Sequence, residues 1–541
     1  MITYIYIFNN ASRAATYGIG TYVRQLSDGL SAMPDTNISF VEMFAETKEF
    51  SITEDERGQK HYKIPPLTTG MENEDYCRTI FYLLARNINI YKLGDRLVFQ
   101  FNYFQHYPLA VLLKGYYPDC RIILTVHYLN WCFELKGNLT RLHQIIAKDY
   151  EPADETERAI VSSLHDEKTF LHLADDVFVL SKNTQEILKK DYKVSEDKLH
   201  LVYNGLGHNM LTRPKKWTSE RNILFVGRLD EIKGLKYLIS AFEKIFEKHT
   251  DTHLRIVGDG DFQPYLAQSR KMLGHVSFLG KVPSDELDEV YETSYIGVTP
   301  SFHEQCSYTV IEMMRHGIPF IGTDSTGLSE MLDATPQLRV HINEEGFDEE
   351  DFVEQIASRI DLLLSDDVLY KQASETVAAQ YKARYRLPVM VEGIQRVVTE
   401  SFYREMYTIS PDFLEHIDIR MMQLVNKRPD IDTDFFGMSG IGVYLWWREE
   451  KLSESPNKEF HRTQLQEFLI YYLDWINDAA NNSELPEEMI ATLADMERKG
   501  FYKTRVKAIL EKQPVGIDVK TTIPSDDKII HNSIKICNCK V

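Results

Sequence analysis

The sequence predicts an α/β protein with two doubly wound, Rossmann-like domains, followed by a mostly helical region. Short apolar runs alternate with longer amphipathic stretches, which is the rhythm of a parallel sheet with helices on both faces. A polar stretch at 212–222, TRPKKWTSERN, interrupts this rhythm, and the same rhythm restarts after it. At 541 residues the chain is also too long for one core. We therefore predict domains at 1–211 and 212–400, and a helical extension at 401–541.

The first domain is predicted from short buried strands. Its first helix is expected over 22–30, because Val23, Leu26 and Leu30 share one helical face. The apolar run at the N-terminus has no basic flank and no small-residue cleavage site, so we interpret it as a strand rather than a signal peptide. The strands are predicted at 2–8, 38–44, 96–101, 121–127, 176–180 and 198–202.

The second domain repeats this alternation. Open parallel sheets bind ligands at the carboxyl ends of their strands, so two facing sheets would present two binding edges to one cleft. Beyond residue 401 the strand-like runs largely disappear and apolar helical patterns dominate. In the second domain, strands are predicted at 223–226, 252–257, 275–279, 296–299 and 319–322, and helices at 235–246, 262–273, 284–293 and 308–316.

Composition and charge exclude several classes of function. With 43% hydrophobic and 26% charged residues, the chain can bury sizeable cores. A net charge of −20 argues against nonspecific binding of nucleic acid, which needs a surplus of Lys and Arg. No apolar run approaches the ~20 residues of a membrane helix, and six scattered cysteines favour a reducing compartment. We expect a cytoplasmic protein, and peripheral contact with the inner face of the membrane stays open. The oligomeric state is not indicated.

A glycine loop follows the first predicted strand and opens the first long helix. It reads Tyr17-Gly18-Ile19-Gly20-Thr21. Glycine lets the backbone approach a ligand closely, and a helix N-terminus offers unpaired N–H groups to an anion. The alternative is a tight strand-to-helix turn, and the loop by itself favours neither interpretation.

Two loops of the second domain carry residues suited to a diphosphate and its sugars. The first, GRLDEIKG, begins at Gly227 and places Arg228 and Lys233 at the carboxyl edge of the sheet, where a solvated basic loop is the alternative. The second, EQCSYTVIE, leads into a predicted helix, with Glu304 before it and Glu312 one turn inside it, about 5.4 Å along the axis. Ser307, Tyr308 and Thr309 would form the helix N-terminus that seats a phosphate, with Glu312 near a ribose and Glu304 near a sugar.

His127 ends a predicted strand of the first domain. A lone histidine is more often a satisfied structural residue. Its place at the strand end, facing the predicted cleft, favours contact with a bound sugar instead.

Taken together, these motifs resemble glycosyltransferase family 4, the retaining enzymes of the GT-B fold. The resemblance spans about 1–400 and is specific because of the order and spacing of its motifs. They are YGIGTYVRQL, TVHYLNW, VYNGL, FVGRLDEIKG, LRIVGDGD, FLGKVP and PSFHEQCSYTVIEMMRHGIPFIGT.

The resemblance implies a nucleotide-sugar donor, a UDP- or GDP-sugar, and no cofactor or metal. It assigns Arg228 and Lys233 to the donor diphosphate, Glu304 to the hydroxyls of the sugar and Glu312 to the ribose. His127 would lie near the donor sugar. The backbone positions that it implies are Gly18 and Gly20 near the diphosphate and acceptor, and Lys281 and Val282 near the base.

The sequence departs from the family pattern at several positions. Tyr17 stands where a further glycine is usual, and Tyr128 where aspartate often follows the histidine. Gln305-Cys306-Ser307 replaces Gly-Phe-Gly, so the hydroxyls of Ser307 and Thr309 become alternative phosphate ligands.

The region after residue 400 carries two weaker signals. FFGMSGIG, at 435–442, resembles the glycine-rich helix entry of LanC-like α-barrel proteins, although a glycine turn between packed helices is preferred. Cys537 and Cys539 lie close to His531, but a metal site needs three or four suitably spaced ligands, so we predict none.

The sequence therefore predicts a metal-independent, retaining glycosyltransferase that serves a glycan, lipid-linked or peptide acceptor. One rival is a non-catalytic GT-B subunit that binds a glycan or peptide. The paired cations and glutamates argue against it, because a pure binder has no need of a diphosphate clamp. A phosphorylase or hydrolase on the same fold is a third possibility, and it would need no nucleotide.

Overall fold

The computed structural model describes residues 2–11, 18–31, 33–88, 96–117, 120–147, 152–207 and 220–399. The predicted helical extension at 401–541, with its glycine-rich stretch and its two cysteines, lies outside these residues. The described part of the chain divides into two compact units. The first draws on 1–66, 100–104 and 123–399, and the second on 67–99 and 105–122.

The first sheet has eight strands, in the order β3-β4-β2-β1-β5-β6-β7-β8. Its β1–β2, β2–β4, β6–β7 and β7–β8 pairs are parallel, and β3–β4 is an antiparallel hairpin at the edge. The strands are β1 (Thr3–Asn10), β2 (Thr36–Met43), β3 (Ser51–Glu54), β4 (Lys60–Lys63), β5 (Arg96–Phe101), β6 (Arg121–Val126), β7 (Asp176–Val179) and β8 (Leu199–Leu201).

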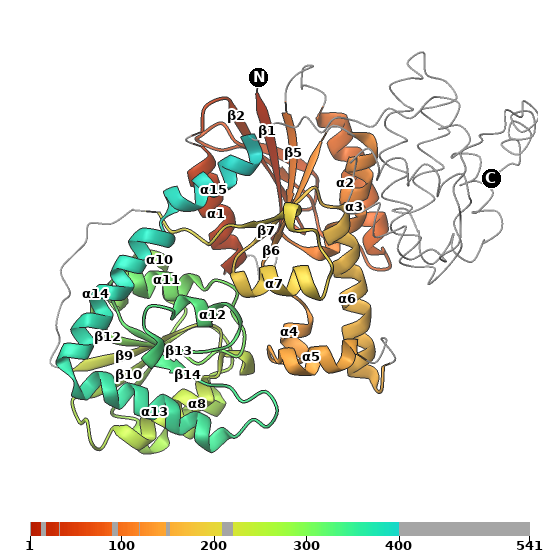
Figure 1. Ribbon diagram of the computed structural model, residues 1–541. Helices are drawn as coiled ribbons and strands as arrows, with labels where there is room; N and C mark the ends of the chain where they lie inside the picture. The colour runs from red at the N-terminus through yellow and green to blue at the C-terminus, as the bar shows by residue number, and fades with distance from the viewer. Residues whose placement is uncertain are drawn as a thin grey trace, which may run out of the picture. The chain divides into compact units, whose positions relative to one another are not determined.

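Of the helices of the first unit that precede the second sheet, α1 packs against β1 and β2, and α7 packs against β7 and β8 (Figure 1). In α1, Tyr22, Leu26 and Leu30 are buried while Arg24 is exposed, as the amphipathic pattern predicts. These helices are α1 (Gly18–Leu30), α4 (Trp131–Glu134), α5 (Leu139–Ile146), α6 (Glu155–Leu173) and α7 (Lys182–Lys190). The described part of the second unit is mainly α2 (Asn73–Asn87) and α3 (Tyr107–Tyr116), where Phe81 packs edge-on against Tyr116.

The second sheet has six strands, in the order β11-β10-β9-β12-β13-β14, and each of its pairs is parallel. All six residues of β12 are buried, as expected for a central strand covered on both faces. The strands are β9 (Arg221–Val226), β10 (Thr252–Val257), β11 (Val276–Gly280), β12 (Ser294–Thr299), β13 (Phe320–Thr323) and β14 (Arg339–Val340). The helices are α8 (Leu235–Ile245), α9 (Gln263–Gln268), α10 (Ser284–Glu292), α11 (Tyr308–Arg315), α12 (Thr326–Met331), α13 (Glu349–Ser365), α14 (Asp367–Arg384) and α15 (Leu387–Thr399).

The structure corrects the sequence prediction at several places. The helix expected over 262–273 is interrupted at Ser269, between α9 and a 3₁₀ turn at Arg270–Met272. Strand β9 begins at Arg221, inside the predicted linker, because the backbone of Arg221 pairs with Thr252 of β10. A bidentate ion pair between Arg221 and Asp251 reinforces this end of the sheet. The β3–β4 hairpin of the first sheet and the short edge strand β14 of the second were not predicted.

Helix α15 packs against α1, although it follows the second sheet in the sequence (Figure 1). Gly29 of α1 makes this possible, because a Cβ there would lie 2.1 Å from the side chain of Val391. The last helix of the predicted second domain therefore lies beside the first helix of the chain.

Candidate active site

The loops that follow β9 and β12 meet at the carboxyl edge of the second sheet, where these strands are neighbours. The backbone N–H of Phe302 donates to Ile232 O at 2.8 Å. Gly234 adopts a left-handed conformation, with φ 70°, and a Cβ there would lie 2.2 Å from Pro300 O. Only glycine permits this approach, which brings the two predicted functional loops together.

An ion pair joins the two loops. Lys233 Nζ contacts Glu304 Oε1, and both side chains are largely buried, with 19% and 15% exposed. Ser301 Oγ donates to the same carboxylate at 3.2 Å. Arg228 is exposed, and its guanidinium pairs with Asp230 at 3.0 Å. The two predicted cations thus lie in one loop but contact different carboxylates.

The start of α12 fixes the backbone of Glu304. Its N–H donates to Thr326 Oγ1 at 3.1 Å, and its carbonyl accepts from Thr326 Oγ1 and from the N–H of Gly327. A Cβ at position 327 would lie 1.7 Å from Gln305 O. The carboxylate at 304 therefore stands on a closely packed backbone turn.

Helix α11 begins at Tyr308, as predicted, with Ser307 as its N-cap residue. No side chain caps its first turn among the described residues, because Ser307 Oγ contacts Thr309 Oγ1 at 3.0 Å instead. The N–H groups of that turn therefore keep the partial positive charge that seats an anion.

Glu312 lies within α11 and is held by a residue that the sequence did not single out. Tyr291, at the end of α10, donates from its phenol to Glu312 Oε2 at 2.6 Å. Burial raises the pKa of Glu312, while the hydrogen bond from Tyr291 and the charges of Arg315 and Arg24 oppose that rise. Tyr291 occupies one carboxylate oxygen and thereby orients the other.

His127 comes directly after β6 rather than at its last position, and it contacts Asn102 beyond β5. The ring of Tyr22 packs edge-on against the imidazole, with centroids 4.6 Å apart. Burial lowers the pKa of His127 to about 3, so the imidazole is neutral near pH 7.

Asn102 fixes the tautomer of this neutral ring. Asn102 Nδ2 donates to Phe8 O at 2.9 Å, so its Oδ1 faces the imidazole and can only accept. His127 Nε2 lies 2.9 Å from that oxygen and must carry the proton. Nδ1 is left as an acceptor, and it has no partner among the described residues.

The remaining predicted positions lie at the start of α1 and at the edge of the second sheet. Gly18 and Gly20 belong to the first turn of α1 rather than to the loop before it, while Tyr17 lies outside the described residues. Gly227 directly follows β9, and its carbonyl oxygen would lie 1.7 Å from a Cβ at Gly258. Lys281 and Val282 directly follow β11 and are at least partly exposed.

The residues that replace the family's Gly-Phe-Gly make specific contacts within the first unit. Gln305 Oε1 accepts from Ser181 Oγ at 3.2 Å and from the hydroxyl of Thr184. Cys306 O accepts from Asn204 Nδ2 at 2.7 Å. These side chains are buried, so they hold the loop of Glu304 against α7 and the VYNGL turn.

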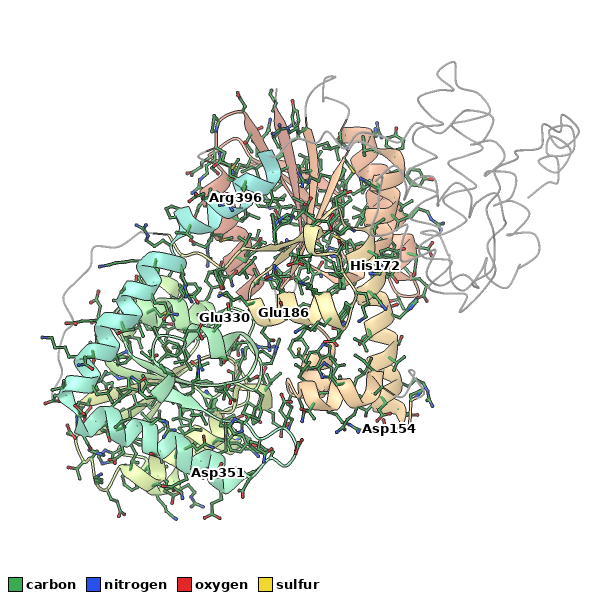
Figure 2. The ribbon with its side chains drawn as sticks, in the orientation of Figure 1. Asp154, His172, Glu186, Glu330, Asp351 and Arg396 are labelled. Carbon is green, nitrogen blue, oxygen red and sulfur yellow. The ribbon has the colours of Figure 1, made fainter. Side chains whose placement is uncertain are left out.

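A further contact near this loop joins α12 to α7. Glu330 Oε2 accepts a hydrogen bond from the backbone N–H of Lys182 at 2.8 Å, at the start of the helix that carries Glu186 (Figure 2). Burial raises the pKa of Glu330, while the hydrogen bonds from Tyr203 and Lys182 lower it.

Sequence reasoning missed Tyr291, Asn102 and Gln305 as supporting residues. Tyr291 lies 21 positions from its glutamate and Asn102 lies 25 positions from its histidine, so no local spacing announces either contact. The only hint in the sequence was the position of Asn102 at the end of a predicted strand, beside the end of the strand that precedes His127.

Among the described residues, no group of three His, Cys, Asp or Glu side chains could hold a metal ion. No described helix is long and apolar enough to cross a bilayer.

Comparison with known proteins finds a family match over the part of the chain that contains both loops. Residues 220–366 match the family described as "Glycosyl transferases group 1". An uncharacterized glycosyltransferase of Methanocaldococcus jannaschii is 33% identical over 172 residues, which are 29% of this chain and 44% of the relative. A D-inositol 3-phosphate glycosyltransferase of Corynebacterium glutamicum is 27% identical over 180 residues, 29% of this chain and 43% of the relative. The chain thus spans less than half the length of these relatives.

A solved structure extends the likeness to both sheets. Sucrose-phosphate synthase from Thermosynechococcus elongatus superposes with a TM-score of 0.56 at 18% identity, and covers 73% of this chain and 98% of its own. At this identity the match shows the fold alone.

Proposed function

We propose that this chain is a retaining glycosyltransferase with a nucleotide-sugar donor, because residues 220–366 match the family described as "Glycosyl transferases group 1" and the fold is shared with a solved sucrose-phosphate synthase. The observation that carries the proposal is the meeting of Lys233 and Glu304 beside the uncapped N-terminus of α11. A cation, a helix dipole and a sugar-binding carboxylate at one strand edge are what a glycosyl diphosphate requires.

In the proposed complex the second sheet holds the donor. Lys233 exchanges its ion pair with Glu304 for one with a phosphate of the donor. Arg228 likewise leaves Asp230 and binds the other phosphate. Glu304, released from its ion pair, accepts hydrogen bonds from the sugar hydroxyls. Glu312 receives the ribose on the oxygen that Tyr291 leaves open. The base, of a UDP- or GDP-sugar, lies against Lys281 and Val282.

The proposed reaction exchanges one C–O bond for another. An acceptor hydroxyl attacks the anomeric carbon on the face that the diphosphate leaves. The bond from that carbon to the phosphate oxygen breaks, and the hydroxyl proton passes to a phosphate oxygen of the departing nucleoside diphosphate. Arg228, Lys233 and the α11 dipole stabilise the negative charge on the leaving group, in the role that a metal ion has in other transferases.

His127 takes a binding role in this scheme rather than an acid role. Its neutral ring cannot donate from Nδ1, since Asn102 keeps the proton on Nε2. Nδ1 would instead accept a hydrogen bond from a hydroxyl of the donor sugar.

The acceptor is proposed to bind the first sheet, as a glycan, a lipid-linked glycan or a peptide. The proposed setting is the cytoplasm, including the inner face of the membrane. The second candidate function, a non-catalytic glycan- or peptide-binding subunit, is favoured by the departures at Gln305, Cys306 and Ser307, which alter the phosphate-side turn.

A panel of nucleotide-sugars, read by release of nucleoside diphosphate, tests the proposal. We expect one donor class to be turned over by the full chain, and Lys233→Met to lose at least ~100-fold in turnover. Lys236→Met is the matched control, because Lys236 is a nearby lysine that pairs with Glu349 on the surface. Binding without turnover would favour the non-catalytic subunit. Activity with inorganic phosphate and no nucleotide would favour a phosphorylase.

A further inference from the structure

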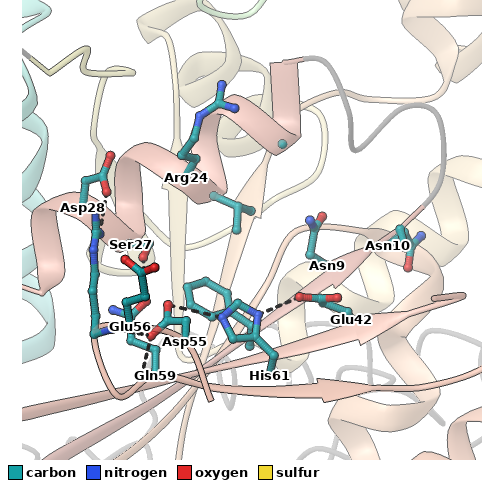
Figure 3. A pocket seen from close by; sticks show the side chains of 15 residues that line it. Asn9, Asn10, Arg24, Ser27, Asp28, Glu42, Asp55, Glu56, Gln59 and His61 are labelled. Atoms are coloured by element: carbon teal, nitrogen blue, oxygen red, sulfur yellow. Dashed lines mark hydrogen bonds and ion pairs between the residues drawn. The ribbon is translucent and has the colours of Figure 1, made fainter. Parts of the chain in front are cut away.

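A cavity of about 710 Å³ lies between α1 and the first sheet, on the side of the edge hairpin (Figure 3). Its size falls within the roughly 300–1,000 Å³ of small-molecule sites. None of the proposed donor contacts uses it except Gly20, which lines it from the first turn of α1. The other lining residues of α1 are Val23, Arg24, Ser27 and Asp28, whose spacing places them on one helical face.

The register of the sheet builds the floor of this cavity. Asn9 of β1 pairs with Glu42 of β2, and Phe40 of β2 pairs with His61 of β4. Phe40 and Glu42 are two residues apart, so all four side chains share one face of the sheet. The floor therefore combines an amide, a carboxylate and an imidazole stacked on a phenyl ring, with centroids 4.8 Å apart.

Much of the polar lining is already engaged within the protein. His61 Nδ1 contacts Glu42 Oε1 at 2.7 Å, and its Nε2 lies 3.5 Å from Asp55. Arg57 Nη1 donates to Asp28 Oδ1 at 2.6 Å, which ties the hairpin turn to α1 (Figure 3). Gln59 accepts from Ser27 Oγ at 2.9 Å. These contacts hold the walls in place and leave a defined set of groups for a ligand.

The groups that remain are mostly hydrogen-bond acceptors. Asn9 Oδ1 lies just beneath the cavity surface, with almost no accessible area and no hydrogen-bond partner among the described residues. This arrangement costs free energy, and a small rotation of the side chain would let a ligand or water relieve it. Among the described residues, the second carboxylate oxygens of Glu42 and Asp28 have no hydrogen-bond partner. Arg24, which contacts Thr21, is the one lining guanidinium that is not paired with a carboxylate in this cavity.

Charge decides which ligand these groups suit. The lining holds the four carboxylates of Asp28, Glu42, Asp55 and Glu56. Two guanidiniums and one imidazole oppose them, so the cavity keeps a net negative charge even when His61 is protonated. The carboxylates would repel a phosphorylated or carboxylated ligand, and only the guanidinium of Arg24 is available to attract it. The hydroxyl groups of a sugar would instead donate hydrogen bonds to the open acceptors.

We propose that this cavity binds the acceptor, and that the acceptor is an uncharged, polyhydroxylated glycan end rather than a phosphorylated or otherwise anionic one. The inference rests on the proposed transferase function and adds the class of its second substrate. Gly20 lines the cavity and also belongs to the turn proposed to approach the donor diphosphate. A sugar in this cavity would thus be bound next to the leaving group.

A glycan array tests the inference with the full chain, in the presence of UDP and, separately, GDP. Neutral glycans are compared with their phosphorylated, sulfated and uronic-acid counterparts. We expect binding to neutral members, and a loss of at least ~10-fold in affinity for the tightest of them in Asn9→Leu and Glu42→Gln. Asn9→Leu is informative even if Glu42→Gln disturbs the hairpin, because Asn9 Oδ1 supports no other residue. Glu46→Gln, an exposed carboxylate beyond the end of β2, is the matched control.

The outcomes separate this inference from the proposed function. Selective binding of anionic glycans, binding of no glycan, or equal binding by Asn9→Leu and the unchanged protein would overturn the neutral-acceptor inference. Hydrolysis of a nucleotide-sugar to nucleoside diphosphate, measured without acceptor, reports on the donor site alone. If the protein hydrolyses a nucleotide-sugar but the array gives one of the overturning results, only the neutral-acceptor inference fails. If it hydrolyses none of the donors, the transferase proposal itself is contradicted.

Discussion

Asn102 Oδ1 lies 2.9 Å from His127 Nε2, and this contact determines which imidazole nitrogen carries the proton. The amide of Asn102 is itself oriented by Phe8 O. The sequence indicated this histidine only by its place at a strand end, and a residue that directly follows the neighbouring strand β5 holds it in one tautomer.

Replacement of Asn102 by aspartate should raise the pKa of His127 from about 3. A carboxylate next to an imidazole favours the charged ring and commonly shifts its pKa by about 1–3 units. An NMR titration of the His127 ring protons measures the shift. The same titration of Asn37→Asp, an exposed position in β2, should show none. An unmoved pKa in Asn102→Asp would mean that the two side chains are not in contact.

Removal of the Arg228 guanidinium should slow sugar transfer. Arg228→Ala is expected to lose ~3 kcal/mol of transition-state stabilisation, about 100-fold in kcat, which is the scale of losing one oxyanion donor. Steady-state kinetics with the donor found in the panel measure this loss. Arg270→Ala, at an exposed position after α9, removes the same charge away from the loop and should leave kcat unchanged. Equal rates for the two variants would remove Arg228 from the mechanism.

Loss of the Tyr291 phenol should weaken nucleotide binding through Glu312. Tyr291→Phe removes the hydrogen bond at 2.6 Å, which lets burial raise the pKa of Glu312 further and frees its carboxylate to turn. We expect affinity for the nucleotide to fall about 10-fold, the scale of one charged hydrogen bond. The control is Tyr370→Phe, which deletes a phenol that donates to Tyr295 O at 3.2 Å. Calorimetry that gives the same Kd for both variants would contradict the role.

Stability should fall as the pH rises, because of Glu167. Its carboxylate accepts from Asn130 N at 2.6 Å and from the phenol of Tyr192, yet burial raises its pKa to about 7. The folded state therefore binds a proton that the unfolded state releases above pH 4.5. The free energy of unfolding should decline between about pH 4.5 and 7, by up to ~1.4 kcal/mol per pH unit from this group.

Glu167→Gln removes this titration and keeps an acceptor for Asn130. Denaturant unfolding of the variant should show a shallower decline across that window than the unchanged protein. Glu155→Gln, at the exposed start of the same helix, is the control. A decline that is identical in all three proteins would show that Glu167 ionises normally.

Most of the fold could be read from the sequence because its strands are apolar and its helices amphipathic. The strands β5 and β10 have the predicted bounds, and the other predicted strands differ by one or two residues at an end. The β3–β4 hairpin escaped prediction because its strands are only four residues long and mostly polar, so they carry no clear alternation. The break at Ser269 was hidden within a continuous amphipathic pattern.

The candidate site could be predicted only in part from the sequence. Gly234 shows why the two loops meet, since its left-handed backbone lies against Pro300. The sequence could place Lys233 and Glu304 at neighbouring strand ends, but it could not show that they pair with each other. Contacts that cross the chain, such as Asn102 with His127, depend on tertiary packing that no local spacing encodes. Likewise, the cavity floor depends on the register of β2 with its two neighbours.

The central claim is that Lys233, together with the loop at 227–234, binds the diphosphate of the donor. Calorimetric titration of the full chain with UDP and uridine, and with GDP and guanosine, isolates the contribution of the diphosphate for each base. We predict that one diphosphate binds at least ~100-fold more tightly than its nucleoside, and that Lys233→Met removes most of this difference while Lys236→Met keeps it. Equal affinities for nucleoside and diphosphate, or an undiminished difference in Lys233→Met, would contradict the account.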